Sequence, residues 1–136
     1  MQPTLVARPF HRPGWGYEEK VDGYRLVAHK EGPRVSLTSR QGKDFTRRFP
    51  ELAKALAGLA AESAVLDAEV AVFDRQLVSR FEWLRAQPKD DVSTPPMVMS
   101  FDLLGLDGED QRKRTLRERR QALVHLLTGE RLIHKP

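Results

Sequence analysis

Apolar and polar residues alternate over several short stretches of this chain, as expected for strands with one face buried in a sheet. The alternation runs over residues 24–30, stops at 31–33, where glycine and proline occur, and resumes over 35–37. Two alternating runs around such a turn predict a β-hairpin. Long β-type runs over 63–73 and 97–104 predict two further strands.

A helical spacing of leucines follows the hairpin. Leu52, Leu56 and Leu59 recur at helical intervals after Pro50. Proline fits the first turn of a helix, because the N–H that it lacks would have no partner there. Since Gly58 is a weak stop signal, we predict an amphipathic helix that starts at Pro50 and ends around Gly58.

Two more helices are predicted later in the chain. A short helix covers 81–84, where three of the four residues are apolar. A longer helix places Leu116, Leu123 and Leu127 on one face and ends near Gly129.

Segments rich in proline and polar residues separate these elements. Residues 1–16 contain three prolines and two glycines, which indicates a loop without regular structure. A second, polar loop passes through Pro88, Asp90 and Pro96. The last residues, 132–136, read as the beginning of another strand.

The order of these elements is hairpin, helix, strand, short helix, strand and helix. This order is typical of an α+β fold in which helices pack on an antiparallel sheet. A length of 136 residues favours one domain, so we predict a single domain over residues 1–136. Because the sequence stops where a strand starts, we expect a domain truncated at its C-terminus.

Composition excludes several classes of protein. Hydrophobic residues make up 40% and charged residues 31% of the chain, as in folded globular proteins. No apolar run approaches the roughly 20 residues that span a bilayer, and the N-terminus lacks the apolar core of a secretory signal. The absence of cysteine excludes disulfides and thiolate metal sites, and the four histidines are scattered. We therefore expect a cytoplasmic protein that does not associate with membranes.

Positive charge is concentrated in two stretches of the sequence. The net charge is only +4, but residues 34–48 hold five basic side chains against one acidic, and 112–120 hold six against one. Two basic patches on a small domain suit a polyanionic partner. A solvated helix face would explain the same composition equally well.

The first candidate for chemistry is the segment Lys20-Val21-Asp22-Gly23-Tyr24-Arg25, just before the first strand. A lysine is a nucleophile when desolvation or nearby positive charge favours its neutral amine. Gly23 permits a tight turn, and Arg25 is placed to meet a phosphate or carboxylate. An ordinary surface turn is the competing interpretation.

Two further segments place polar groups at the predicted sheet. Arg40, in Ser39-Arg40-Gln41-Gly42, ends the hairpin, where it could hold a ribose or a phosphate. Asp67 and Glu69 lie on one face of the third strand because side chains alternate along a strand. Paired carboxylates suit magnesium or sugar hydroxyls. A solvated turn and a wet edge strand are the respective alternatives.

Phe101 is the fourth candidate. Strict alternation places its ring on one face of the fourth strand with Met97, Met99 and Leu103. Core packing explains this placement, and stacking on a nucleobase is the functional alternative.

The four segments resemble the nucleotidyl-transferase motifs of ATP-dependent DNA ligases in their order and spacing. Three flanking segments look like the bacterial end-joining type, often called ligase D. They are Arg12-Pro13-Gly14-Trp15, Asp44-Phe45-Thr46-Arg47-Arg48-Phe49-Pro50 and Leu116-Arg117-Glu118-Arg119-Arg120. The resemblance covers almost the whole chain and implies part of a nucleotidyltransferase domain of the DNA ligase and mRNA-capping enzyme type, related in shape to ATP-grasp domains.

The resemblance implies a three-step reaction. A lysine attacks the α-phosphate of ATP and forms lysyl-AMP, AMP passes to the 5′-phosphate of a nick, and the 3′-hydroxyl then displaces it. By matching position, Lys20 is the nucleophile and Glu18 meets the adenine. The partners implied are nicked or broken double-stranded DNA and end-joining proteins, in a bacterial cytoplasm close to the nucleoid.

The resemblance also assigns the remaining site residues. Arg25 and Arg40 would bind phosphate and ribose, Glu69 the ribose or a Mg²⁺ (or Mn²⁺) ion, and Phe101 would stack on adenine. The basic residues of the second motif and its flank would bind DNA; they are Arg40, Lys43, Arg47 and Arg48.

The sequence departs from the family pattern at several points. Ala68 replaces the glycine of the usual Asp-Gly-Glu, and Val21 stands where an aromatic residue is frequent. A later Glu-Gly motif, a later lysine pair and the C-terminal OB-fold domain are missing. We therefore expect that this chain alone does not seal nicks at a useful rate. A non-catalytic nucleic-acid-binding module and an RNA ligase or capping-type enzyme are the alternatives.

Overall fold

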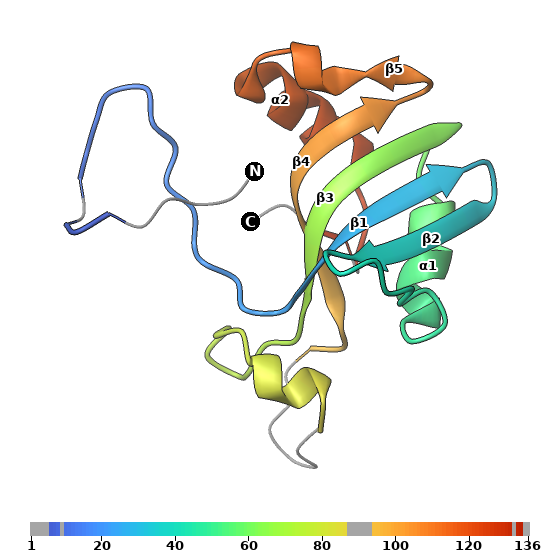
Figure 1. The fold of residues 1–136 in the computed structure, drawn as a ribbon, viewed down its shortest axis with the longest axis horizontal. Helices are drawn as coiled ribbons and strands as arrows, with labels where there is room; N and C mark the ends of the chain where they lie inside the picture. Colours follow the sequence, from blue (N-terminus) through green and yellow to red (C-terminus); the bar gives the residue numbers. More distant parts are fainter. Residues whose placement is uncertain (1–5, 9, 87–93, 132, 135–136) are drawn as a thin grey trace.

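The computed structural model describes residues 6–8, 10–86, 94–131 and 133–134, which form a twisted sheet with helices on one side (Figure 1). The strands are β1 (Tyr24–Glu31), β2 (Arg34–Ser39), β3 (Ser63–Ala71), β4 (Met97–Leu106), β5 (Glu109–Asp110) and β6 (Ile133–His134). Their order is β2-β1-β3-β4-β5, and every neighbouring pair in it is antiparallel. The short β6 differs, because it pairs with β4 in parallel.

Two α-helices and two 3₁₀ turns connect the strands. They are α1 (Pro50–Ala57), η1 (Phe81–Leu84), η2 (Gln111–Lys113) and α2 (Leu116–Leu126). Pro50 occupies the first turn of α1, as the sequence predicts. A capping box starts α2, where the Thr115 hydroxyl accepts from the Glu118 N–H and the Glu118 carboxylate accepts from the Thr115 N–H.

One face of the sheet packs against both α-helices. Leu26 of β1, Leu66 of β3 and Leu103 of β4 are at most 1% exposed, and they belong to one cluster with the helix residues. The helix and loop contributions to that cluster are Phe49, Leu52, Leu56, Leu59, Val72, Leu84, Leu123, Leu126 and Leu127. Alternate side chains of β1 and β3 enter this core, so the predicted period of two and the α+β fold are confirmed.

The pairing of β4 corrects the predicted placement of Leu103. Ser100 lies opposite Ala68, and Asp102 lies opposite Asp67, so Phe101 has no opposite residue in β3. This β-bulge changes the alternation of the strand. Leu103 therefore faces the core, whereas Met97 and Met99 lie on the other face.

Three other predictions need correction or qualification. Leu116 is 50% exposed, because the first turn of α2 carries it away from the core that buries Leu123. The third strand ends at Ala71, two residues before the predicted end. Most of the polar loop, residues 87–93, lies outside the described residues.

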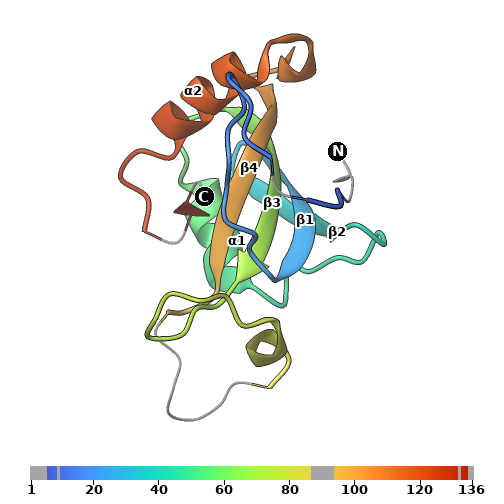
Figure 2. The ribbon, with the colours of Figure 1, turned by 90° about the vertical axis from the view of Figure 1, so that its left-hand side faces the viewer.

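The second face of the sheet carries the polar residues that the sequence singled out. Arg25 of β1 lies opposite Glu69 of β3, and both are partly buried. Figure 2 shows the chain that precedes β1 passing in front of β3 and β4, with α1 behind them. Within the described residues, none of the helices combines the length and the apolar character that crossing a membrane requires.

Candidate active site

Lys20 lies in the exposed segment that leads into β1. Its side chain is 82% exposed and forms an ion pair with Asp22, two residues later. The hydrogen bond and the charge of Asp22 raise the pKa of the Lys20 amine, and the charge of Glu69 acts in the same direction. In this conformation Lys20 is protonated at neutral pH, so it needs a change of surroundings before it can act as a nucleophile.

Gly23 fixes the turn after Lys20 against β3. Its N–H donates a hydrogen bond of 2.6 Å to Oε1 of Glu69. A β-carbon at this position would clash with the Val70 carbonyl oxygen and lie 2.8 Å from its carbonyl carbon. Only glycine allows the two backbones to approach so closely.

The Glu69 carboxylate is half-buried beneath this turn. Burial raises its pKa, and the hydrogen bond from Gly23 and the charge of Lys20 partly oppose that effect. Lys20 and Glu69 lie near enough for the charge of each to act on the pKa of the other.

A second link holds the Lys20 turn to the loop after β3. The N–H of Asp22 donates to the hydroxyl of Ser79 at 2.9 Å. Asp74 shapes that loop, because its carboxylate accepts from the N–H groups of Gln76 and Val78 and from the guanidinium of Arg80. No sequence pattern pointed to Ser79, since its contact spans 57 residues.

Arg25 forms a two-point contact with Asp67 across the strand pair. Its Nε and Nη2 donate to the two carboxylate oxygens at 3.1 and 2.7 Å. The backbone carbonyl of Arg25 also accepts a hydrogen bond of 3.4 Å from the N–H of Arg40. This bond brings the first and second predicted motifs side by side.

A pocket of about 710 Å³ lies between these two motifs. Its lining consists of Gly23, Tyr24, Arg25, Ser39, Arg40, Gln41, Lys43, Phe45, Arg48, Phe81 and Arg85. Five of these are cationic, and the lining contains no acidic side chain. Such a pocket is suited to phosphate groups.

Arg48 is held by aromatic rings at the edge of this pocket. Its guanidinium carbon lies 4.9 Å from the ring centre of Tyr24 and about as close to the rings of Phe45 and Phe49. It also donates a 2.8 Å hydrogen bond to the carbonyl of Leu84. These contacts give Arg48 a structural role in the aromatic cluster next to the pocket.

Most of the second basic stretch is neutralised within the fold. The ion pairs that involve it are Arg112–Asp110, Arg114–Glu109, Arg119–Asp102 and Arg120–Glu18. Charge counting alone could not show this, because the last two pairs join residues far apart in sequence. The Arg40 side of the molecule is therefore the better candidate for DNA contact.

Glu18 and Phe101 lie apart from the cationic pocket. Glu18 belongs to a different hollow of about 790 Å³, between residues 14–18 and α2. Phe101 is half-buried at the bulge of β4. Neither residue lines the pocket that contains Arg25 and Arg40.

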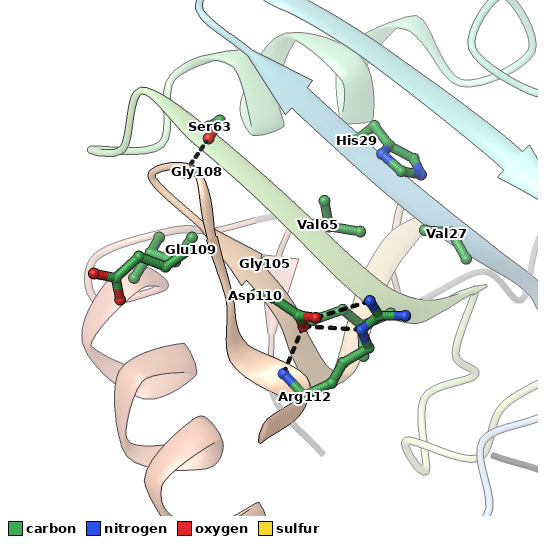
Figure 3. Close-up of a pocket in the computed structure, with 11 residues that line it drawn as sticks. Val27, His29, Ser63, Val65, Gly105, Gly108, Glu109, Asp110 and Arg112 are labelled. Carbon is green, nitrogen blue, oxygen red and sulfur yellow. Dashed lines mark hydrogen bonds and ion pairs between the residues drawn. The ribbon is translucent and has the colours of Figure 1, made fainter. Parts of the chain in front are cut away.

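A further pocket, of about 470 Å³, lies on the same sheet at the opposite end of β1 (Figure 3). Val27 and Val65 line it, together with Asp110 and Arg112, which point toward one another. Two hydrogen bonds from the guanidinium of Arg112 and one from its backbone N–H lower the pKa of Asp110 to about 2, so these charges satisfy each other. None of the predicted site residues lines this pocket.

The described residues contain no cluster of three side chains able to form a metal site on their own. Magnesium at phosphate-transfer sites is commonly held by one or two carboxylates together with substrate phosphates. Glu69 fits that mode, because only one of its oxygens is used by the Gly23 N–H.

Comparison with known proteins decides the family. A family model described as ATP dependent DNA ligase domain matches residues 4–134. This chain belongs to that family. The match confirms the resemblance drawn from the four motifs.

The relatives are much longer than this ligase-family chain. The multifunctional non-homologous end joining protein LigD of Pseudomonas aeruginosa is 40% identical over 126 residues, which cover 93% of this chain and 15% of that protein. DNA ligase C1 of Mycolicibacterium smegmatis is 36% identical, over 88% of this chain and 38% of its own length. The chain therefore spans well under half of these relatives.

Solved structures agree with the family assignment. The crystal structure of the ligase domain from M. tuberculosis LigD matches with a TM-score of 0.71 and 33% identity, over 88% of this chain and 38% of that one. A mycobacterial DNA ligase D complexed with ATP and MES matches with the same TM-score and 31% identity. The α+β architecture is thus that of a ligase domain.

Proposed function

We propose that this chain supplies the nucleotide-binding part of an ATP-dependent DNA ligase of the bacterial end-joining type. The observation that carries the proposal is the cation-lined pocket shared by Arg25 and Arg40, next to the turn that presents Lys20. Family membership makes ATP and nicked DNA the expected substrates of the whole protein. End-joining proteins at broken DNA are its expected partners.

In the first step, Nζ of Lys20 attacks the α-phosphorus of ATP. The N–P bond forms, the bond from the α-phosphorus to the bridging oxygen breaks, and pyrophosphate leaves with its electron pair. Lys20 must lose a proton beforehand. Its contact with Asp22 has to loosen for that loss, since Asp22 raises the pKa of the amine.

The cations near Lys20 would stabilise the charge that develops on the phosphoryl oxygens. Two hydrogen bonds to Asp67 orient the guanidinium of Arg25 at the sheet face. Arg40 is exposed at the pocket rim, within reach of a phosphate or ribose. Glu69 would hold a Mg²⁺ ion, which supplies additional positive charge at the phosphates when bound.

In the next two steps, AMP moves from Lys20 to a 5′-phosphate, and a 3′-hydroxyl displaces AMP to close the phosphodiester. DNA would approach over Arg40, Lys43 and Arg47, all of them exposed. Arg48 would support this surface through its aromatic contacts. Phe101 is assigned to stacking on the adenine.

The test is covalent labelling. The purified chain is incubated with ATP or GTP labelled at the α-phosphate, with and without Mg²⁺, and separated on a denaturing gel. We expect label from ATP only, and loss of label in Lys20→Ala. Lys54→Ala, which removes an exposed lysine from α1, is the matched control and should label normally. A folded protein that binds DNA but takes no label would favour the non-catalytic alternative.

A further inference from the structure

The turn that presents Lys20 is held through two consecutive backbone N–H groups. The N–H of Gly23 donates to the Glu69 carboxylate at 2.6 Å, and the N–H of Asp22 donates to the Ser79 hydroxyl at 2.9 Å. The segment that contains Lys20 has no regular secondary structure, and the Lys20 side chain is 82% exposed. The position of Lys20 therefore depends on contacts that its neighbours make with the rest of the fold.

Ser79 belongs to a tight turn after β3 that is built around Asp74. The Asp74 side chain is buried, and its Oδ1 accepts hydrogen bonds of 2.9 Å from the N–H groups of both Gln76 and Val78. Its Oδ2 accepts from Nε of Arg80 at 2.8 Å. The N–H of Asp74 also donates to the carbonyl of Val78 at 3.0 Å. These contacts fix the residues on both sides of Ser79, so its hydroxyl has a defined position relative to β3.

Ser79 lies outside the cation-lined pocket. It is not one of the residues that line the space shared by Arg25 and Arg40. A serine hydroxyl can accept and donate hydrogen bonds, and here it accepts from the Asp22 N–H. Ser79 can therefore influence the reaction through the Lys20 turn without contacting a nucleotide in that pocket.

We propose that Ser79 is a positioning residue, which holds the Lys20 turn so that Nζ can reach the α-phosphorus of ATP. This inference rests on the function proposed above. A reacting group has to lie about 3–3.5 Å from its target and in line with it, so a small displacement caused by a residue outside the chemistry can lower the rate about 100-fold. Without the Ser79 hydroxyl, water can accept from the Asp22 N–H. A water molecule is not attached to the turn after β3, so it cannot hold Lys20 in place.

The experiment follows the formation of lysyl-AMP by the full chain over time, with ATP labelled at the α-phosphate and at a series of ATP concentrations. Ser79→Ala removes the acceptor, Ser79→Thr keeps it, and Ser36→Ala removes an exposed serine from β2 as the matched control. Ser79→Ala should lower the maximal rate about 10- to 100-fold and change the half-saturating ATP concentration by less than about twofold. Ser79→Thr and Ser36→Ala should keep the wild-type rate.

Three results would overturn the inference. They are an unchanged maximal rate in Ser79→Ala, an equal loss of rate in Ser79→Thr, and a higher half-saturating ATP concentration at an unchanged maximal rate. If Ser79→Ala no longer unfolds cooperatively on heating, Ser79→Cys replaces it under the same expectations, because sulfur is only a weak acceptor. A folded wild-type chain that takes no label from ATP would overturn the proposed function itself, so the two failures are distinguishable.

Discussion

The N–H of Gly23 donates a 2.6 Å hydrogen bond to the Glu69 carboxylate, and this bond joins two of the four motifs. It places the turn that presents Lys20 directly over β3. The backbone of β3 leaves no space for a side chain at position 23. The glycine is therefore required by close approach between two segments 46 residues apart.

Replacing Gly23 by alanine should displace the Lys20 turn. The new methyl group would clash with the Val70 backbone, which cannot move without disturbing β3. Crowding of this kind costs about 1–3 kcal/mol of unfolding free energy. Urea denaturation measures this loss, and AMP labelling should fall with it. Gly14→Ala is the control. A β-carbon at Gly14 would meet nothing within 4 Å, so this variant adds backbone strain without crowding.

The adenylation rate should rise with pH, since Lys20 reacts as a neutral amine. Asp22 raises the pKa of that amine, which moves the rise to higher pH. Asp22→Asn removes the charge and should shift the profile to lower pH, whatever it does to the maximal rate. Glu51→Gln, on the exposed start of α1, should leave the profile where it is. An unshifted profile in Asp22→Asn would mean that another group controls the amine.

Glu69→Gln should separate stability from function. Burial raises the pKa of Glu69, so the folded protein holds a proton that the unfolded chain releases at lower pH. The stability contributed by this group is therefore lost as pH rises through that window. At pH 7 Glu69→Gln should melt at the same temperature as the wild type or at a higher one. Below about pH 4 the two proteins should melt at the same temperature. AMP labelling of Glu69→Gln should decrease even though its stability does not.

Asp67→Asn provides the contrasting case on the same strand. It breaks the two-point contact with Arg25 and should lower stability by about 1–3 kcal/mol. A lower melting temperature for Glu69→Gln than for Asp67→Asn at pH 7 would contradict the expectation that burial of the charged Glu69 carboxylate costs stability.

Arg47 and Arg48 should behave differently although they are neighbours. Arg48→Ala removes the aromatic contacts and the bond to Leu84, and should cost about 1–2 kcal/mol of stability. Arg47 is exposed, so Arg47→Ala should leave stability unchanged and weaken DNA binding. The slope of log K against log salt should become shallower by about 1 in Arg47→Ala. Melting curves and salt titrations of the two variants distinguish these roles.

The hairpin and both α-helices could be predicted from sequence because each buries one face. Burial imposes the period of two on β1 and β3 and the helical spacing on Leu52 and Leu56. The bulge at Phe101 could not be predicted. Residues on both faces of β4 are largely apolar, so no polar position marks the change of alternation.

The candidate site could be predicted only in part. Gly23, Arg25 and Glu69 belong to short motifs whose order suggested a common function, and the structure brings them together. The partners of Arg119 and Arg120 lie 17 and 102 positions away. A run of like charges gives no sign of which members are paired across the fold.

The bulge of β4 also limits which changes of length this strand can tolerate. Deleting one codon between Ser100 and Leu103 would remove the extra residue and leave Ser100 and Leu103 on the core face, where they are now. Deleting one codon within the regular stretch 97–100 would instead turn one part of the strand over, so that either Val98 or Ser100 would leave the core face. Gaps in an alignment of relatives should therefore collect at the bulge and in the connections on either side of the strand, and not in its regular stretch.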